Sequence, residues 1–204
     1  YEVLTLFASS FGTSYLATQS AISTIASLFY MTSFSVGIAS STRIANFVGA
    51  KRVDCAALAT KIGIISSVLI GVVNGCAMIA LRRPLASLFS KDEEVIQMIV
   101  DIFPLIAFTA IFDSLNAVSG CALRGQGMQR VGGYINLFAY YVVGLPLAYF
   151  FGFYLDYRLN GLWYGMLISF IVIGTWQSIY VLDANWDQIL EEADDRKEDD
   201  YVEV

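Results

Sequence analysis

The chain has 204 residues, of which 57% are hydrophobic and 15% are charged, and it contains no histidine. Soluble domains are usually about 45–50% apolar and about 25% charged, so this composition excludes an ordinary soluble domain. The lack of histidine excludes histidine-based catalysis, histidine metal sites and histidine pH switches. The net charge of −6 is unevenly spread, because residues 183–204 carry −8 and the remainder carries +2. We therefore expect a membrane protein with an acidic tail.

Long uncharged stretches mark the predicted membrane spans, since a spanning helix needs about 20 mostly apolar residues. The first such stretch, residues 3–42, contains 40 uncharged residues. Gly12 and the small polar residues around it, within residues 11–15, predict a turn that divides this stretch. We predict an all-α, six-helix transmembrane bundle whose first helix is truncated. Its spans are residues 1–12, 19–47, 58–81, 95–123, 131–154 and 160–182.

The first predicted span is too short to cross a bilayer. Residues 1–12 make a helix of about 18 Å, whereas the hydrocarbon core is about 30 Å thick. We therefore expect the chain to be part of a longer protein. Six passes place both termini on one side, where the loops carry six basic residues against four on the opposite side. The positive-inside rule predicts that the acidic tail, residues 183–204, is cytoplasmic, and its composition predicts disorder beyond Glu192.

Small and aromatic residues predict how the helices pack and where they meet the lipid headgroups. Gly71 with Gly75, and Gly161 with Gly165, have the G-x-x-x-G spacing that lets two helix backbones approach closely. Aromatic residues near the predicted span ends are expected to anchor at the headgroups. These aromatic residues are Tyr154, Tyr157, Trp163, Tyr164 and Trp186.

Motifs of soluble enzymes are missing from the sequence. Gly125 and Gly127 begin a G-x-G pattern, but Arg130 stands where a dinucleotide-binding loop needs its third glycine. The sequence has neither a phosphate-binding G-x-x-x-x-G-K-[ST] loop nor a G-x-S-x-G nucleophile elbow. The three cysteines are widely spaced and form no C-x-x-C pair, so no zinc site or disulfide framework is indicated. We expect no enzyme activity, cofactor, metal or nucleic-acid partner.

Ionisable residues at membrane depth are the candidate functional residues. Asp113 has only apolar and small polar neighbours within its predicted span, and Glu2 precedes 40 uncharged residues. A charge at the bilayer centre costs about 2.5–3.5 kcal/mol on insertion scales and usually marks a cavity or ion path. Asn116, three residues after Asp113, shares its helix face and is a candidate cavity-lining residue. The alternatives are that Asp113 is a structural acid bonded to neighbouring helices and that Glu2 is simply solvated.

Several blocks of the sequence resemble the eukaryotic branch of the multidrug and toxic compound extrusion (MATE) transporters. Residues 19–49 resemble the eighth helix of that fold, and residues 113–127 resemble the end of the tenth. Tyr134-Ile-Asn-Leu with Gly144-Leu-Pro is similar to the eleventh helix, and Asn160-Gly-Leu-Trp-Tyr-Gly to the start of the twelfth. The resemblance covers residues 1–182.

The resemblance implies one lobe of a twelve-helix transporter, with the N-terminal lobe missing. Members of this family export organic cations or other small metabolites in exchange for H⁺ or Na⁺. By motif, Glu2 and Asp113 match the family's acid pair on the seventh and tenth helices, which implies that they bind the substrate cation or the coupling ion. We expect a multi-pass protein of the plasma membrane or a vacuolar or other endomembrane. The alternative is an incomplete membrane fragment or assembly partner without transport activity of its own.

Overall fold

The computed structural model of the chain describes residues 2–202, and the side chains of residues 2–195. Within this part, five helical segments are long and apolar enough to cross a membrane. They are α2 (Thr13–Gly49), α3 (Val53–Phe89), α4 (Glu93–Gly125), the segment Gln129–Tyr154 and α7 (Arg158–Leu182). A short helix, α1 (Glu2–Ser9), precedes them, and α8 (Trp186–Val202) follows. The predicted fold class, an all-α bundle with a short first helix, is confirmed.

The segment Gln129–Tyr154, the fifth helix of the bundle, is continuous but not uniformly α-helical. It begins with α5 (Gln129–Phe138), widens into a π-helical stretch at Ala139–Gly144, and continues as α6 (Leu145–Tyr149). A second π-helical stretch, Phe150–Tyr154, ends it. Such wider turns shift the register of the side chains that follow and are frequent at functional sites.

The helices are longer than the predicted spans because they continue past the apolar residues into charged ones. For example, α3 includes Arg82 and Arg83, and α4 begins at Glu93 with the Asp92 carboxylate accepting a hydrogen bond from the Glu94 backbone N–H (3.0 Å). The turn expected at residues 11–15 is also narrower than predicted. The chain reverses around Gly12, whose φ of 124° is in the region that favours glycine, and α2 already begins at Thr13.

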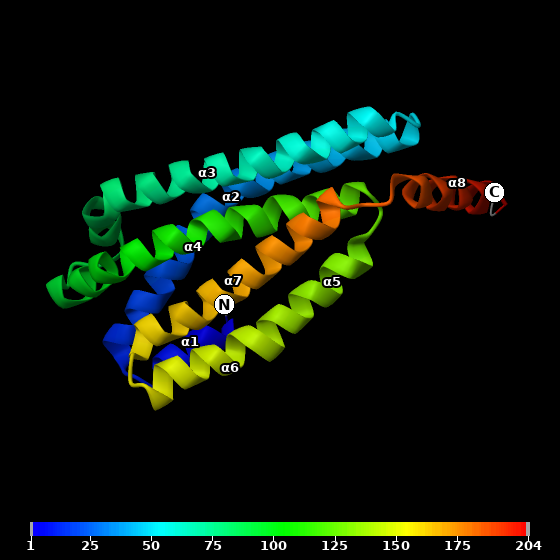
Figure 1. The fold of residues 1–204 in the computed structure, drawn as a ribbon. Coiled ribbons are helices and arrows are strands. Elements are labelled where there is room, and N and C mark those ends of the chain that lie inside the picture. Colours follow the sequence, from blue (N-terminus) through cyan, green and yellow to red (C-terminus); the bar gives the residue numbers. More distant parts are fainter. Residues whose placement is uncertain (1, 203–204) are drawn as a thin grey trace.

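The central helix of the bundle is α4, which packs against α2, α3 and α7 (Figure 1). The α3–α4 contact depends on the first predicted glycine pair. A Cβ atom on Gly71 would lie 2.7 Å from the Cα of Ile111, and one on Gly75 would lie 2.8 Å from the Ala107 carbonyl oxygen. Gly161 makes the same kind of contact with the fifth helix, since a Cβ there would lie 2.5 Å from the Phe151 carbonyl carbon. Both G-x-x-x-G motifs are therefore packing faces, as predicted.

Trp163 corrects one prediction, because it is a core residue and not a headgroup anchor. Its side chain is 1% exposed, and its indole N–H donates a hydrogen bond to Oε1 of Gln19 on α2 (2.9 Å). The sequence places Trp163 near the start of a span, but its buried partner comes from a helix 144 residues away in the sequence. The pair ties the start of α7 to the start of α2.

We expect Trp163→Phe to lower the free energy of unfolding by about 1–3 kcal/mol, because the change leaves the buried Gln19 acceptor without its donor. Denaturant unfolding of the protein in detergent micelles measures this loss. Trp176→Phe is the matched control, since Trp176 is 48% exposed on the same helix. An equal effect of the two changes would contradict a special role for the Gln19–Trp163 hydrogen bond.

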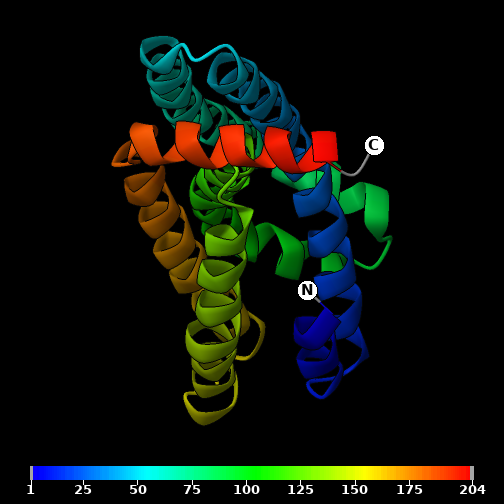
Figure 2. The same cartoon turned by 90° about the vertical axis from the view of Figure 1, so that its right-hand side faces the viewer.

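The acidic tail is helical where we expected disorder. Helix α8 runs to Val202 and lies across the end of the bundle at which α2, α4 and α7 finish (Figure 2). Ile189 is fully buried, in a cluster that includes Val48, Leu123 and Val181. An ion pair of 2.6 Å joins Lys51 Nζ to Asp194 Oδ2. These contacts hold the first half of α8 against the end of the bundle.

Candidate functional site

Asp113 lies on α4, about 18 Å along the helix from its end at Gly125. It borders two cavities, both of which are also lined by Tyr30. The first, called here the wide cavity, has a volume of about 340 Å³ and lies between α2, α4, α7 and the fifth helix. The second, called here the narrow cavity, has a volume of about 10 Å³ and lies mainly between α2, α3 and α4.

The wide cavity combines one carboxyl group with aromatic rings. It is lined by Ser27, Tyr30, Met31, Asp113, Asn116, Tyr140 and Phe170. Ligand pockets of about 300–1,000 Å³ hold drug-sized molecules and usually combine apolar walls with a few polar groups. Aromatic faces attract cations, and a carboxylate adds the opposite charge. This lining suits a small organic cation.

Tyr140 connects α4 to the fifth helix across this cavity. The Asn116 side-chain amide donates a hydrogen bond to the Tyr140 hydroxyl (3.4 Å). Tyr140 belongs to the first π-helical stretch, and its ring packs edge-on against Phe170 with the ring centroids 6.0 Å apart. Asn116 therefore lines the cavity and also orients one of its aromatic walls.

Asp113 has no hydrogen bond or ion pair with any described residue. Its nearest polar neighbours in the two cavities are hydroxyl and amide groups, and no Lys or Arg lines either cavity. An unpaired carboxylate at membrane depth is unfavourable. The Asp113 carboxylate is therefore suited to hold either a proton or a bound cation, and the proton and the cation can compete for it.

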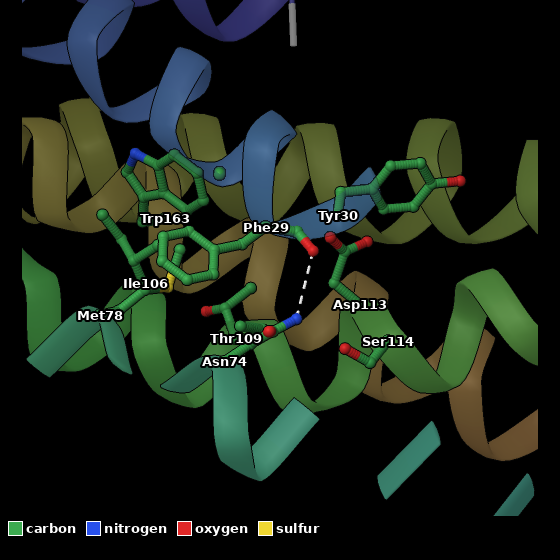
Figure 3. Close-up of a pocket in the computed structure, with 11 residues that line it drawn as sticks. Phe29, Tyr30, Asn74, Met78, Ile106, Thr109, Asp113, Ser114 and Trp163 are labelled. Atoms are coloured by element: carbon green, nitrogen blue, oxygen red, sulfur yellow. Dashed lines mark hydrogen bonds between the residues drawn. The ribbon is translucent and has the colours of Figure 1, made fainter. Parts of the chain in front are cut away.

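A polar cluster, of which Ser33, Asn74 and Ser114 are buried, joins three helices beside Asp113. Asn74 on α3 donates hydrogen bonds to the Phe29 carbonyl oxygen (3.2 Å) and to the Thr32 hydroxyl (2.9 Å), both on α2. The hydroxyl groups of Ser33 and Ser114 lie 2.7 Å apart and connect α2 with α4. Figure 3 shows Asn74 reaching the Phe29 carbonyl next to Asp113 and Ser114. The cluster holds α2 and α3 in register with the part of α4 that carries Asp113.

Glu2, the other predicted site residue, does not share a cavity with Asp113 in the part of the chain that the structure describes. Its side chain is exposed at the start of α1, and it is not among the residues that line either cavity beside Asp113. The next two residues, Val3 and Leu4, line a third cavity of about 350 Å³. Tyr140 lines both this cavity and the wide cavity.

Our sequence reasoning missed four residues that border Asp113, namely Tyr30, Asn74, Thr109 and Tyr140. Asn74 carried a usable signal, because a side-chain amide within the uncharged stretch 62–81 needs a buried partner. Nothing in the sequence singles out Tyr30 and Tyr140, because the chain has 12 tyrosines and the sequence does not indicate which ones face inward.

Comparison with known proteins agrees with this architecture. The family model named MatE matches residues 1–150. The uncharacterized transporter YDR338C of Saccharomyces cerevisiae is 47% identical over 204 residues, which are 100% of this chain and 29% of that protein. Multidrug and toxin extrusion protein 1 of Homo sapiens is 28% identical over 193 residues, 95% of this chain and 34% of that protein. The crystal structure of the eukaryotic MATE transporter AtDTX14 superposes with a TM-score of 0.85 at 30% identity, covering 89% of this chain and 40% of that one.

These matches define an integral, multi-pass membrane protein with the fold of a transporter. The chain belongs to the MATE family, as the sequence resemblance predicted. It spans about a third of the length of the curated relatives that it matches.

Proposed function

We propose that the chain forms the C-terminal half of a secondary antiporter that exports organic cations or small xenobiotics in exchange for protons or sodium. The wide cavity carries this proposal, because it places the unpaired Asp113 carboxyl group among the aromatic rings of Tyr30, Tyr140 and Phe170. In such a site an organic cation and a proton exclude one another, since each neutralises the same carboxylate. Mutually exclusive binding is the minimum requirement for exchange.

Glu2 is proposed as a second acid of the same pathway. It lies at the start of α1, and its neighbours Val3 and Leu4 line a cavity that shares Tyr140 with the wide cavity. In alternating access, two bodies move against each other around a site near the midplane of the membrane. We infer that the second body is an N-terminal lobe, that the membrane is the plasma membrane or an endomembrane, and that α8 lies on its cytoplasmic face.

Uptake into liposomes tests the proposal. The 204-residue chain, reconstituted together with the N-terminal lobe of a MATE relative and shown to be helical by circular dichroism, is supplied with a fluorescent organic cation. We expect an acidic lumen, a sodium-loaded lumen, or both, to drive uptake above that of empty liposomes. If the two folded lobes together give no uptake with either gradient, the proposal fails for this chain. The alternative, a membrane fragment or assembly partner without transport of its own, would then be favoured.

A further inference from the structure

The narrow cavity beside Asp113 has room for about one water molecule. About 10 Å³ of it is open to the centre of a water molecule. Roughly 10–15 Å³ of such space holds one water if two to four polar groups face it. Four polar side chains other than Asp113 line it, from α2, α3 and α4. They are Tyr30, Asn74, Thr109 and Ser114.

Two of these side chains have oxygen lone pairs to spare. Thr109 is 2% exposed, and its hydroxyl donates a hydrogen bond to the Leu105 carbonyl (2.8 Å) and can still accept one. The Asn74 carbonyl oxygen accepts at most one hydrogen bond from Thr32 (3.3 Å), which leaves a second lone pair. The narrow cavity therefore offers acceptors on one side and the Asp113 carboxyl group on the other.

We propose that a single water molecule binds in the narrow cavity and donates one hydrogen bond to Asp113 and the other to the Thr109 hydroxyl oxygen. Asp113 would then be hydrated from the side of α3 while its other side faces the wide cavity. This assigns Thr109 as a positioning residue that acts on Asp113 through the water. The inference deepens the proposed function of Asp113, but the presence of the water can be tested without any transport.

The other side chains that face Asp113 determine which groups can change protonation in a pH jump. Tyr30 on α2 and Tyr140 on the fifth helix are the titratable ones, whereas α3 contributes Asn74 and Met78 and α7 contributes Trp163 and Phe170, none of which titrates. Tyrosine titrates near pH 10 in solution, far above aspartate. An acid-to-neutral pH jump therefore addresses Asp113 alone among these residues.

Infrared difference spectroscopy of the chain in liposomes tests the proposal. A pH jump is recorded in ordinary water and in water enriched in the heavy oxygen isotope. We expect an O–H stretching band that shifts with the isotope, together with a carboxyl band that is lost in Asp113→Asn. Thr109→Val should remove the water band and shift the carboxyl band, whereas Thr109→Ser, which keeps the hydroxyl, should preserve both.

Thr60→Val is the matched control. Thr60 is 1% exposed on α3, and its hydroxyl donates a hydrogen bond to the Ala56 carbonyl (2.9 Å), just as the Thr109 hydroxyl does to the Leu105 carbonyl. Thr60 does not line the narrow cavity. We expect Thr60→Val to leave both bands unchanged. A water band that persists in Thr109→Val, or is lost equally in Thr60→Val, would overturn the proposal. Loss of the band on adding Na⁺ at constant pH would also overturn it, because a cation would then occupy the cavity. None of these outcomes depends on whether the chain transports.

Discussion

Asp113→Asn is expected to reduce gradient-driven uptake of an organic cation by more than tenfold, to the level of empty liposomes. The change keeps the shape of the side chain but removes both the negative charge and the exchangeable proton. Opposite charges 4 Å apart attract by about 4 kcal/mol at an effective dielectric constant of 20, and a tenfold effect requires only about 1.4 kcal/mol. Initial rates of uptake with and without the gradient measure the loss.

Asp101→Asn is the control for this prediction. Asp101 is on the same helix, but it is exposed and accepts a hydrogen bond from Gln97 (2.8 Å). It does not line the wide cavity. We expect Asp101→Asn to leave the rate of uptake close to wild type. Uptake that still follows the gradient in Asp113→Asn would show that Asp113 does not carry the exchange.

Gly165→Ala is expected to destabilise the bundle by about 1–3 kcal/mol, the usual cost of overpacking a close contact. A Cβ atom on Gly165 would overlap the backbone nitrogen of Ala148 and lie 2.5 Å from its Cα. Both atoms belong to the backbone of the fifth helix, so α7 must move away to make room. Because α7 contributes Phe170 to the wide cavity, we also expect weaker binding there. Denaturant unfolding in detergent measures the change in stability.

Gly133→Ala separates this clash from the general effect of replacing glycine in a helix. Gly133 is also helical, but nothing lies within 4 Å of the position that its Cβ would take. Alanine has a higher helix propensity than glycine by about 1 kcal/mol, so Gly133→Ala should be neutral or stabilising. If Gly165→Ala were equally well tolerated, α7 and the fifth helix would not be in the close contact that the structure shows.

The helices and the position of Asp113 were predictable because both depend on local sequence. Long uncharged stretches mark spans, and a lone acid within one of them stands out. Asn116 could be paired with Asp113 because a separation of three residues places two side chains on one helix face. The glycine pairs also predicted close contacts, although not which helix each pair would meet.

Contacts between distant segments could not be predicted in the same way. Trp163 lies near the start of a predicted span, where headgroup anchors are common. Its burial depends on Gln19, a partner that is distant in the sequence and that only the folded structure places against it. The aromatic walls of the wide cavity come from α2, α7 and the fifth helix, and the π-helical stretch at Ala139–Gly144 changes which side chains face inward. Disorder was expected beyond Glu192 because acids dominate the composition there, yet α8 continues to Val202 from a first half in which Ile189 is buried.

Measurement of the ion that moves when the organic cation moves tests the central claim most directly. Liposomes containing the chain and the N-terminal lobe of a MATE relative, with no initial gradient, carry a pH-sensitive dye and a Na⁺-sensitive dye in the lumen, and the organic cation is added outside. If Asp113 exchanges one ion for the other, entry of the cation should raise the luminal pH or lower luminal Na⁺. Both signals should be lost in Asp113→Asn and kept in Asp101→Asn. Entry of the cation without either signal, or an unchanged signal in Asp113→Asn, would contradict the account.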